Sequence, residues 1–146
     1  MNPTKFDQDF VKKLIKQKEG KSLDFKNKIT SREKIAKTLA AFANTSGGSL
    51  LIGVSDRGQV RGIDPEEEKF MIETANREYC NPEVNLSFHE IKLTDTEFLE
   101  NSNEEEITLL LVYISPSLPL SIDFISSKGD KIKYIRQGDR TIAIRN

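Results

Sequence analysis

Apolar residues recur at helical spacing in three stretches of the chain, and each stretch has its own end signals. The first covers residues 6–20, where lysines occupy the other helical faces. The second covers 32–43 and is preceded by Ser31, whose side chain suits a helix N-cap. The third covers 65–79 and is preceded by Asp64, with a proline at the first helical position. The pattern therefore predicts three helices.

Shorter apolar runs, some alternating and some continuous, predict the strands. These runs lie at 22–26, 49–54, 84–93, 107–114, 131–136 and 140–144. The run at 107–114 is continuous, so we expect a central strand that is buried on both faces. In 84–93 the apolar positions change parity, which predicts a bulge near residues 89–90. Turn residues predict hairpins between 49–54 and 59–62 and between the last two runs.

The mixture of helices and strands predicts an α+β fold in a single domain, residues 1–146, with a mixed β-sheet and about three helices. The composition is globular, because 36% of the residues are hydrophobic and 31% are charged. The lone cysteine, Cys80, excludes an internal disulfide framework and a cysteine-cluster metal site. The longest apolar run, 109–114, is too short to span a membrane. We therefore expect a cytoplasmic protein with no membrane partner.

The net charge of −1 conceals a strong asymmetry along the chain. Residues 1–40 carry eleven Lys and Arg against five Asp and Glu, a net charge of +6. Residues 64–106 carry three against fourteen, a net charge of −11. A one-sided basic surface is typical of nucleic-acid-binding proteins, although a solvated helix face gives the same pattern. The acidic block favours the alternative of a protein-interaction or oligomerisation domain, because it would repel phosphate.

A short motif, Asn-Thr-Ser-Gly-Gly at residues 44–48, connects the second predicted helix to the next strand. Gly47 and Gly48 supply the positive φ angles and the close backbone approach that such a tight reversal requires. Asn44 has a side chain that suits hydrogen bonds to free backbone groups of the turn. A phosphate-binding Walker loop is excluded, because its glycines follow a strand and precede a lysine and a helix. Taken alone, the motif indicates a tight connection.

Charged residues flank this connection on both sides. Upstream, Glu19 and Asp24 lie five residues apart, and we expect Asp24 and Lys26 to share the solvent-facing side of a strand. Downstream, Asp56 follows the next strand. The simplest interpretation is that Glu19 and Asp24 form surface ion pairs with Lys21 and Lys26, which contribute about 0–1 kcal/mol each.

Three segments together resemble one protein family. They read Glu-x4-Asp-Phe-Lys at 19–26, Ala-Phe-Ala-Asn-Thr-Ser-Gly-Gly-Ser-Leu-Leu-Ile-Gly-Val at 41–54, and Tyr-Ile-Arg-Gln-Gly-Asp-Arg-Thr at 134–141. This pattern is similar to the Schlafen-type AlbA-like domain, a family described as DNA-binding, over about residues 19–144. The resemblance implies an α+β domain with a mixed sheet that binds DNA or RNA. We expect it here as a stand-alone domain with a regulatory role.

In some Schlafen proteins this domain is a metal-dependent endoribonuclease that uses three acidic residues. By position, the resemblance implies that Glu19 and Asp24 are the first two acids and that Asp56 is the third. Three carboxylates suit Mg²⁺ or Mn²⁺, which would be the cofactor of such a nuclease, whereas a binding module needs none. The chain departs from the family pattern at Asp24, where the longer Glu is usual, at Ser55, where an acid is usual, and at Asp139, where Ser is usual.

The resemblance also places five cations near the central sheet or its turns, where we expect them to contact phosphate. They are Lys26, Arg57, Arg61, Arg136 and Arg140. Asn44, Gly47 and Gly48 are then the scaffold that would bring the charged residues together. Three hypotheses follow: a nucleic-acid-binding module, a metal-dependent endoribonuclease, and an interaction or oligomerisation domain without a nucleic-acid role.

Overall fold

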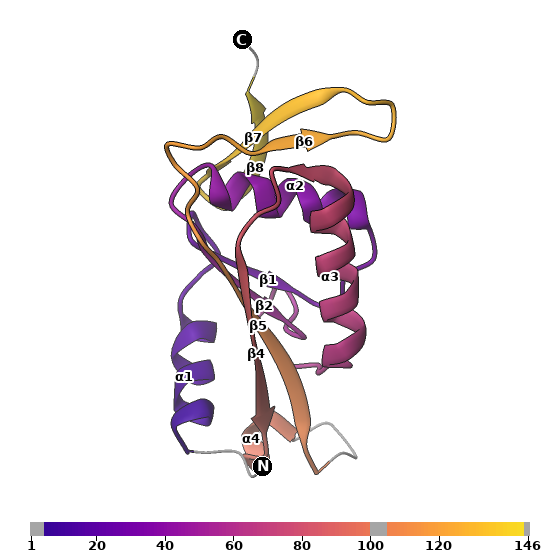
Figure 1. Ribbon diagram of the computed structural model, residues 1–146. Coiled ribbons are helices and arrows are strands. Elements are labelled where there is room, and N and C mark those ends of the chain that lie inside the picture. The colour runs from indigo at the N-terminus through magenta and orange to yellow at the C-terminus, as the bar shows by residue number, and fades with distance from the viewer. Residues whose placement is uncertain (1–4, 100–104, 145–146) are drawn as a thin grey trace.

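The computed structural model describes residues 5–99 and 105–144, and within these ranges it has two β-sheets and four helices (Figure 1). The first sheet is mixed, because one pair of neighbouring strands is parallel and the other two pairs are antiparallel. In spatial order its strands are β1 (Leu23–Lys26), β2 (Gly48–Ile52), β5 (Ile107–Ile114) and β4 (Leu86–Leu93). The predicted α+β fold with a mixed sheet is confirmed.

The second sheet is antiparallel and is built mainly from the C-terminal part of the chain. In spatial order its strands are β3 (Cys80–Asn81), β6 (Asp123–Ile125), β7 (Lys131–Gln137) and β8 (Arg140–Ile144). The last two strands form the predicted hairpin, with Gly138 and Asp139 at its turn. The sequence does not predict β3 and β6, because two or three residues are too few to show an alternation.

The helices cover both faces of the first sheet (Figure 1). Helix α1 (Lys5–Lys16) packs on one face, and α2 (Arg32–Ala43) and α3 (Pro65–Tyr79) pack on the other. Helix α2 also contacts β7, so it lies between the two sheets, and every residue from 39 to 43 is 0% exposed. A short helix, α4 (Thr96–Leu99), follows β4. Within the described ranges, no helix has the length and apolar character needed to cross a bilayer.

The helix ends confirm two predicted caps and correct one predicted boundary. In α2 the Ser31 hydroxyl accepts a hydrogen bond from a backbone N–H of the first turn, and in α3 the Asp64 carboxylate accepts two. Helix α1 ends at Lys16, short of the predicted end at Gly20. The reason is that the Gly20 N–H turns back to donate to the Leu23 carbonyl (2.9 Å), which directs the chain into β1.

The predicted bulge near residues 89–90 is wrong. Strand β4 pairs with β5 in one unbroken register along its whole length. The apolar positions change parity because each face of the strand is covered over a different half: Leu86 packs against the core below α2 and α3, whereas Leu93 belongs to the core below α1. The same half-coverage leaves Tyr113 of β5 47% exposed, so this interior strand is buried on both faces only in part.

The predicted hairpin after β2 is reduced to a tight turn. Val54 and Val60 form a single β-bridge instead of two paired strands. The Ser55 N–H donates to the Gln59 carbonyl (2.9 Å), which closes the turn. This turn at residues 55–61 follows β2. It carries two of the predicted phosphate-binding arginines.

Candidate nucleic-acid interface

The turn between α2 and β2 hydrogen-bonds to the second sheet through its side chains. Asn44 is 5% exposed, and its Nδ2 donates to the carbonyls of Ile122 and Tyr134, both at 2.9 Å. Its Oδ1 accepts from the Ile122 N–H at 2.7 Å. The neighbouring Thr45 Oγ1 accepts from the Arg136 N–H at 2.9 Å. The Asn-Thr pair therefore fixes the second sheet against the C-terminal end of α2.

The two glycines of this turn are required by close packing. Gly47 has a φ of +71°, and a Cβ there would lie 2.6 Å from the Ile114 carbonyl oxygen. At Gly48 a Cβ would lie 2.6 Å from the Phe42 ring. Neither position has room for a side chain, so the backbone itself fills the space between α2 and the first sheet.

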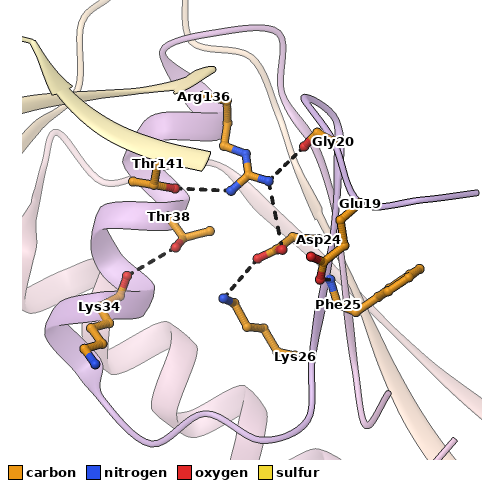
Figure 2. Close-up of polar contacts among 9 residues, drawn as sticks. All are labelled: Glu19, Gly20, Asp24, Phe25, Lys26, Lys34, Thr38, Arg136 and Thr141. Carbon is orange, nitrogen blue, oxygen red and sulfur yellow. Dashed lines mark hydrogen bonds and ion pairs between the residues drawn. The ribbon is translucent and has the colours of Figure 1, made fainter. Parts of the chain in front are cut away.

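Asp24 does not lie on a solvent-facing side of β1, which corrects the prediction from the sequence. It is 4% exposed, because α2 and the second sheet cover this face of the strand. Lys26 Nζ lies 3.1 Å from Asp24 Oδ2, and Arg136 Nη2 lies 3.9 Å from Asp24 Oδ1 (Figure 2). The expected pair of Asp24 with Lys26 is present, but the carboxylate is buried and also faces a second cation. Each carboxylate oxygen thus faces a positive charge.

The Arg136 side chain is enclosed by three parts of the chain. Its Nη1 donates to Thr141 Oγ1 (3.2 Å) on β8, and its Nη2 donates to the Gly20 carbonyl (2.8 Å) before β1 (Figure 2). The guanidinium carbon lies 4.5 Å from the centre of the Phe42 ring on α2. Arg136 is 5% exposed, so any contribution to a phosphate contact is indirect, through the elements that it holds together.

Asp24 was a candidate from the sequence, but three other partners of Arg136 were not. Phe42 stacks under the guanidinium, Thr45 accepts from the Arg136 backbone N–H, and Thr141 accepts from the side chain. All three lie inside the motif segments at 41–54 and 134–141. Their place in these motifs is the signal that could have identified them.

Glu19 lies beside Asp24, the second of the predicted acids. Its Oε1 accepts the Phe25 N–H at 2.8 Å (Figure 2). Burial raises the pKa of Glu19, the hydrogen bond from the Phe25 amide lowers it, and the negative charges of Asp24 and Asp56 raise it. Glu19 thus lies next to Asp24, and the charge of Asp56 also reaches it.

The three acids do not form a ready metal site. Among residues 5–99 and 105–144, no three His, Cys, Asp or Glu side chains gather closely enough to hold a metal ion. Both oxygens of Asp24 already face cations, and Asp56 is exposed on the turn after β2. Three carboxylates have the right chemistry for Mg²⁺ or Mn²⁺, but in this arrangement they do not fit one ion.

The other predicted phosphate-binding cations reach the surface. Arg57 and Arg61 are exposed on the turn after β2, where Arg61 Nη2 donates to Gln59 Oε1 at 3.0 Å. Arg140 is exposed at the turn of the β7–β8 hairpin. The side chain of Lys26 is 38% exposed beside the acids. The structure thus gathers Arg57 and Arg61 on one turn and places Arg140 at the edge of the second sheet.

Comparisons with known proteins identify one family and one similar fold. The family model described as Schlafen, AlbA_2 matches residues 19–145, which leaves α1 outside the match. No curated protein matches the chain. Among solved structures, the chain is similar to the crystal structure of the DIP2311 protein from Corynebacterium diphtheriae, with a TM-score of 0.54 and 17% identity over 95% of this chain. It spans 29% of that protein, and at this identity the likeness concerns the fold alone.

Proposed function

The chain belongs to the Schlafen, AlbA_2 family, and from this membership we propose that it is a domain that binds DNA or RNA. The observation that carries the proposal is the exposure of Arg57, Arg61 and Arg140 on turns within the matched segment. A guanidinium presents several N–H donors in a planar fork, which suits phosphate oxygens better than a single ammonium does.

The distribution of acidic side chains supports one direction of approach. Helix α3 carries a cluster of glutamates and lies on the opposite face of the first sheet from α1 (Figure 1). A polyanion would be repelled from α3, and the exposed arginines lie on the turn after β2 and on the β7–β8 hairpin instead. We therefore propose these two turns as the nucleic-acid interface.

The proposed residues have two different roles. Lys26, Arg57, Arg61 and Arg140 supply phosphate contacts, which hold a nucleic acid without reading its sequence. Arg136 is a positioning residue, because its enclosed side chain holds β7 and β8 against α2 and the loop before β1. Asn44, Gly47 and Gly48 serve the same scaffold.

Binding measured over a salt series tests the proposal. Fluorescence anisotropy with labelled single strands and duplexes of DNA and RNA should give a log affinity that falls linearly with log salt. Arg57→Gln and Arg140→Gln should each reduce the slope by about 1 on a duplex. The matched control is Arg77→Gln, an exposed arginine on α3, which should leave the slope unchanged. No binding to any of the four nucleic acids at low salt would exclude this function.

The second candidate is a metal-dependent endoribonuclease that uses Glu19, Asp24 and Asp56. The observation in its favour is that Glu19 lies next to Asp24, where its Oε1 accepts the Phe25 N–H at 2.8 Å. Cleavage of RNA with added Mn²⁺ should be compared between the wild type and Asp56→Asn, with the exposed Asp130→Asn as control. Loss of cleavage in Asp56→Asn alone supports this candidate. Equal cleavage by both variants, or none by the wild type, excludes it.

A further inference from the structure

A groove lies between α1, the turn after β2 and α4, and its lining does not include Glu19, Asp24 or Asp56. We call it the α1 groove. Its volume of about 760 Å³ lies within the range of about 300–1,000 Å³ that is usual for sites that bind small ligands. Its lining includes Lys12, Lys16, Val60, Arg61, Phe98 and Ile107.

Part of this lining is apolar and includes an aromatic ring. Val60 and Phe98 are partly buried and pack against the core below α1, and Ile107 is 6% exposed. Lys12 Nζ lies 5.8 Å from the centre of the Phe98 ring, a cation–π contact that restricts the ring. A flat apolar group would gain contact area against Phe98 and Val60.

The cations of the groove differ in whether their charge is already compensated. Lys12 Nζ lies 3.1 Å from Asp95 Oδ2 and 2.7 Å from Glu97 Oε1, so its charge is taken up by two carboxylates. Lys16 and Arg61 are exposed, and in the part of the chain that the structure describes neither has a carboxylate partner. The groove therefore offers an apolar surface together with two uncompensated cations.

The groove is not explained by the segment that the family shares. Helix α1 supplies Lys12 and Lys16, and it lies before the matched residues 19–145. The turn with Val60 and Arg61, Phe98 of α4 and Ile107 of β5 come from the matched segment. The groove therefore combines residues from inside and outside the matched segment.

We propose that the α1 groove binds single-stranded nucleic acid, with a base against Phe98 and Val60 and the adjoining phosphates on Lys16 and Arg61. This inference rests on the proposed function and specifies the form of nucleic acid. A duplex keeps its bases stacked and would present only phosphate to the groove, so the apolar lining would remain unused. In a single strand every base has a free face for an aromatic ring. The phosphates of its backbone supply negative charge for Lys16 and Arg61, which have no carboxylate partner among the residues that the structure describes.

The first measurement compares one labelled sequence as a single strand and as a duplex, with the chain of residues 1–146. The single strand should bind more tightly than the duplex. Phe98→Ala should weaken single-strand binding by about tenfold, as expected for the loss of one base–aromatic contact, and should leave duplex binding unchanged. The matched control is Phe70→Ala, which removes a 65% exposed aromatic ring from α3 and should change neither affinity.

The second pair of variants keeps the test independent of any effect of Phe98→Ala on folding. Lys16→Gln and Arg61→Gln replace exposed side chains, and each should lower the salt slope of single-strand binding by about 0.7. Ultraviolet crosslinking of the bound strand, read by mass spectrometry, should mark peptides that contain residues 58–61 or 97–98. A crosslink confined to the β7–β8 hairpin would overturn the inference.

The outcomes separate this inference from the function on which it rests. If the wild type binds no nucleic acid, both fall. If Arg57→Gln and Arg140→Gln weaken binding while Phe98→Ala, Lys16→Gln and Arg61→Gln do not, only the groove inference falls. Preference for the duplex, or competition by an oligoglutamate peptide as effective as that by a single strand of equal charge, would also overturn it. The latter result would assign the groove to acidic peptides.

Discussion

Arg136 and Asp24 lie inside the protein, where an ionised side chain is stable only beside an opposite charge. Arg136→Met should lower the free energy of unfolding by about 3 kcal/mol, because it leaves the buried Asp24 carboxylate with Lys26 alone. Urea denaturation measures this loss, and adding Asp24→Asn to the same chain should recover part of it. Arg140→Met, at an exposed arginine, should change stability by less than about 0.5 kcal/mol. Equal effects of the two arginine variants would contradict a structural pair.

The Cys80 thiol gives the stability a dependence on pH. Burial raises its pKa from 9.0 to about 12, and Glu83 adds to the rise. In the unfolded chain the thiol loses its proton first, so the stabilisation is complete below the unfolded pKa and is lost as pH rises toward the folded one. The stability difference between the wild type and Cys80→Ala should therefore shrink from about pH 8 to about pH 11. A difference that is constant over this range would count against the buried thiol.

The burial of Glu68 could not be predicted from the sequence. Glu66, Glu67 and Glu68 all suit the positive N-terminus of a helix, and the sequence gives no reason to separate them. In the structure Glu68 is 1% exposed, and its Oε1 accepts the Ile29 N–H at 2.7 Å. Its partner comes from a distant segment, so no local pattern could have predicted the contact. The burial of Asp24 was missed for the same reason.

At the scale of single elements, the turn between α2 and β2 depends on two missing side chains. Gly47→Ala should destabilise the protein by about 3 kcal/mol, because the methyl group meets the Ile114 carbonyl at a left-handed backbone position. The control is Gly138→Ala, where φ is +60° but nothing lies within 4 Å of the added Cβ, and we expect about 1 kcal/mol. Thermal unfolding of both variants checks the difference. Similar losses would mean that backbone conformation, and not space, sets the cost.

Elements with local end signals could be predicted, and elements defined by distant contacts could not. The caps at Ser31 and Asp64 fixed the starts of two helices, because a cap bonds within its own turn. Strand β4 was located correctly, but its parity change depends on which helix covers each half of the sheet. Strands β3 and β6 are defined by their pairing with each other, and their few residues are too short a pattern to predict it.

Over the whole molecule, the acidic side of α3 should weaken nucleic-acid binding from a distance. Neutralising Glu66 and Glu67, both exposed, by Glu→Gln should raise the affinity for a single strand about two- to fivefold at low salt. The gain should vanish at about 0.5 M salt, where the screening length falls to a few ångström. Anisotropy at both salt concentrations measures it, with unfolding curves to confirm that the helix start tolerates the change. A gain that persists at high salt would point to a direct contact instead.

The candidate site was foreseeable to the extent that its parts share the family motifs. The segments at 19–26, 44–48 and 134–141 do meet, through Asn44, Thr45 and Arg136. The sequence could not show that Arg136 is enclosed, because three separate segments surround it. The α1 groove was unforeseen for a similar reason, since its lining comes from four parts of the chain.

Helix α2 has a sheet on each side, so each sheet depends on this helix for part of its packing. Separating the second sheet would expose Phe42 and Phe124, and it would leave Asn44 and Arg136 without their bonds. The cost of opening one layer is therefore close to the cost of opening the whole protein. The two sheets should act as a single cooperative unit, in which the backbone amides of α2 exchange hydrogen with water only when the entire chain unfolds.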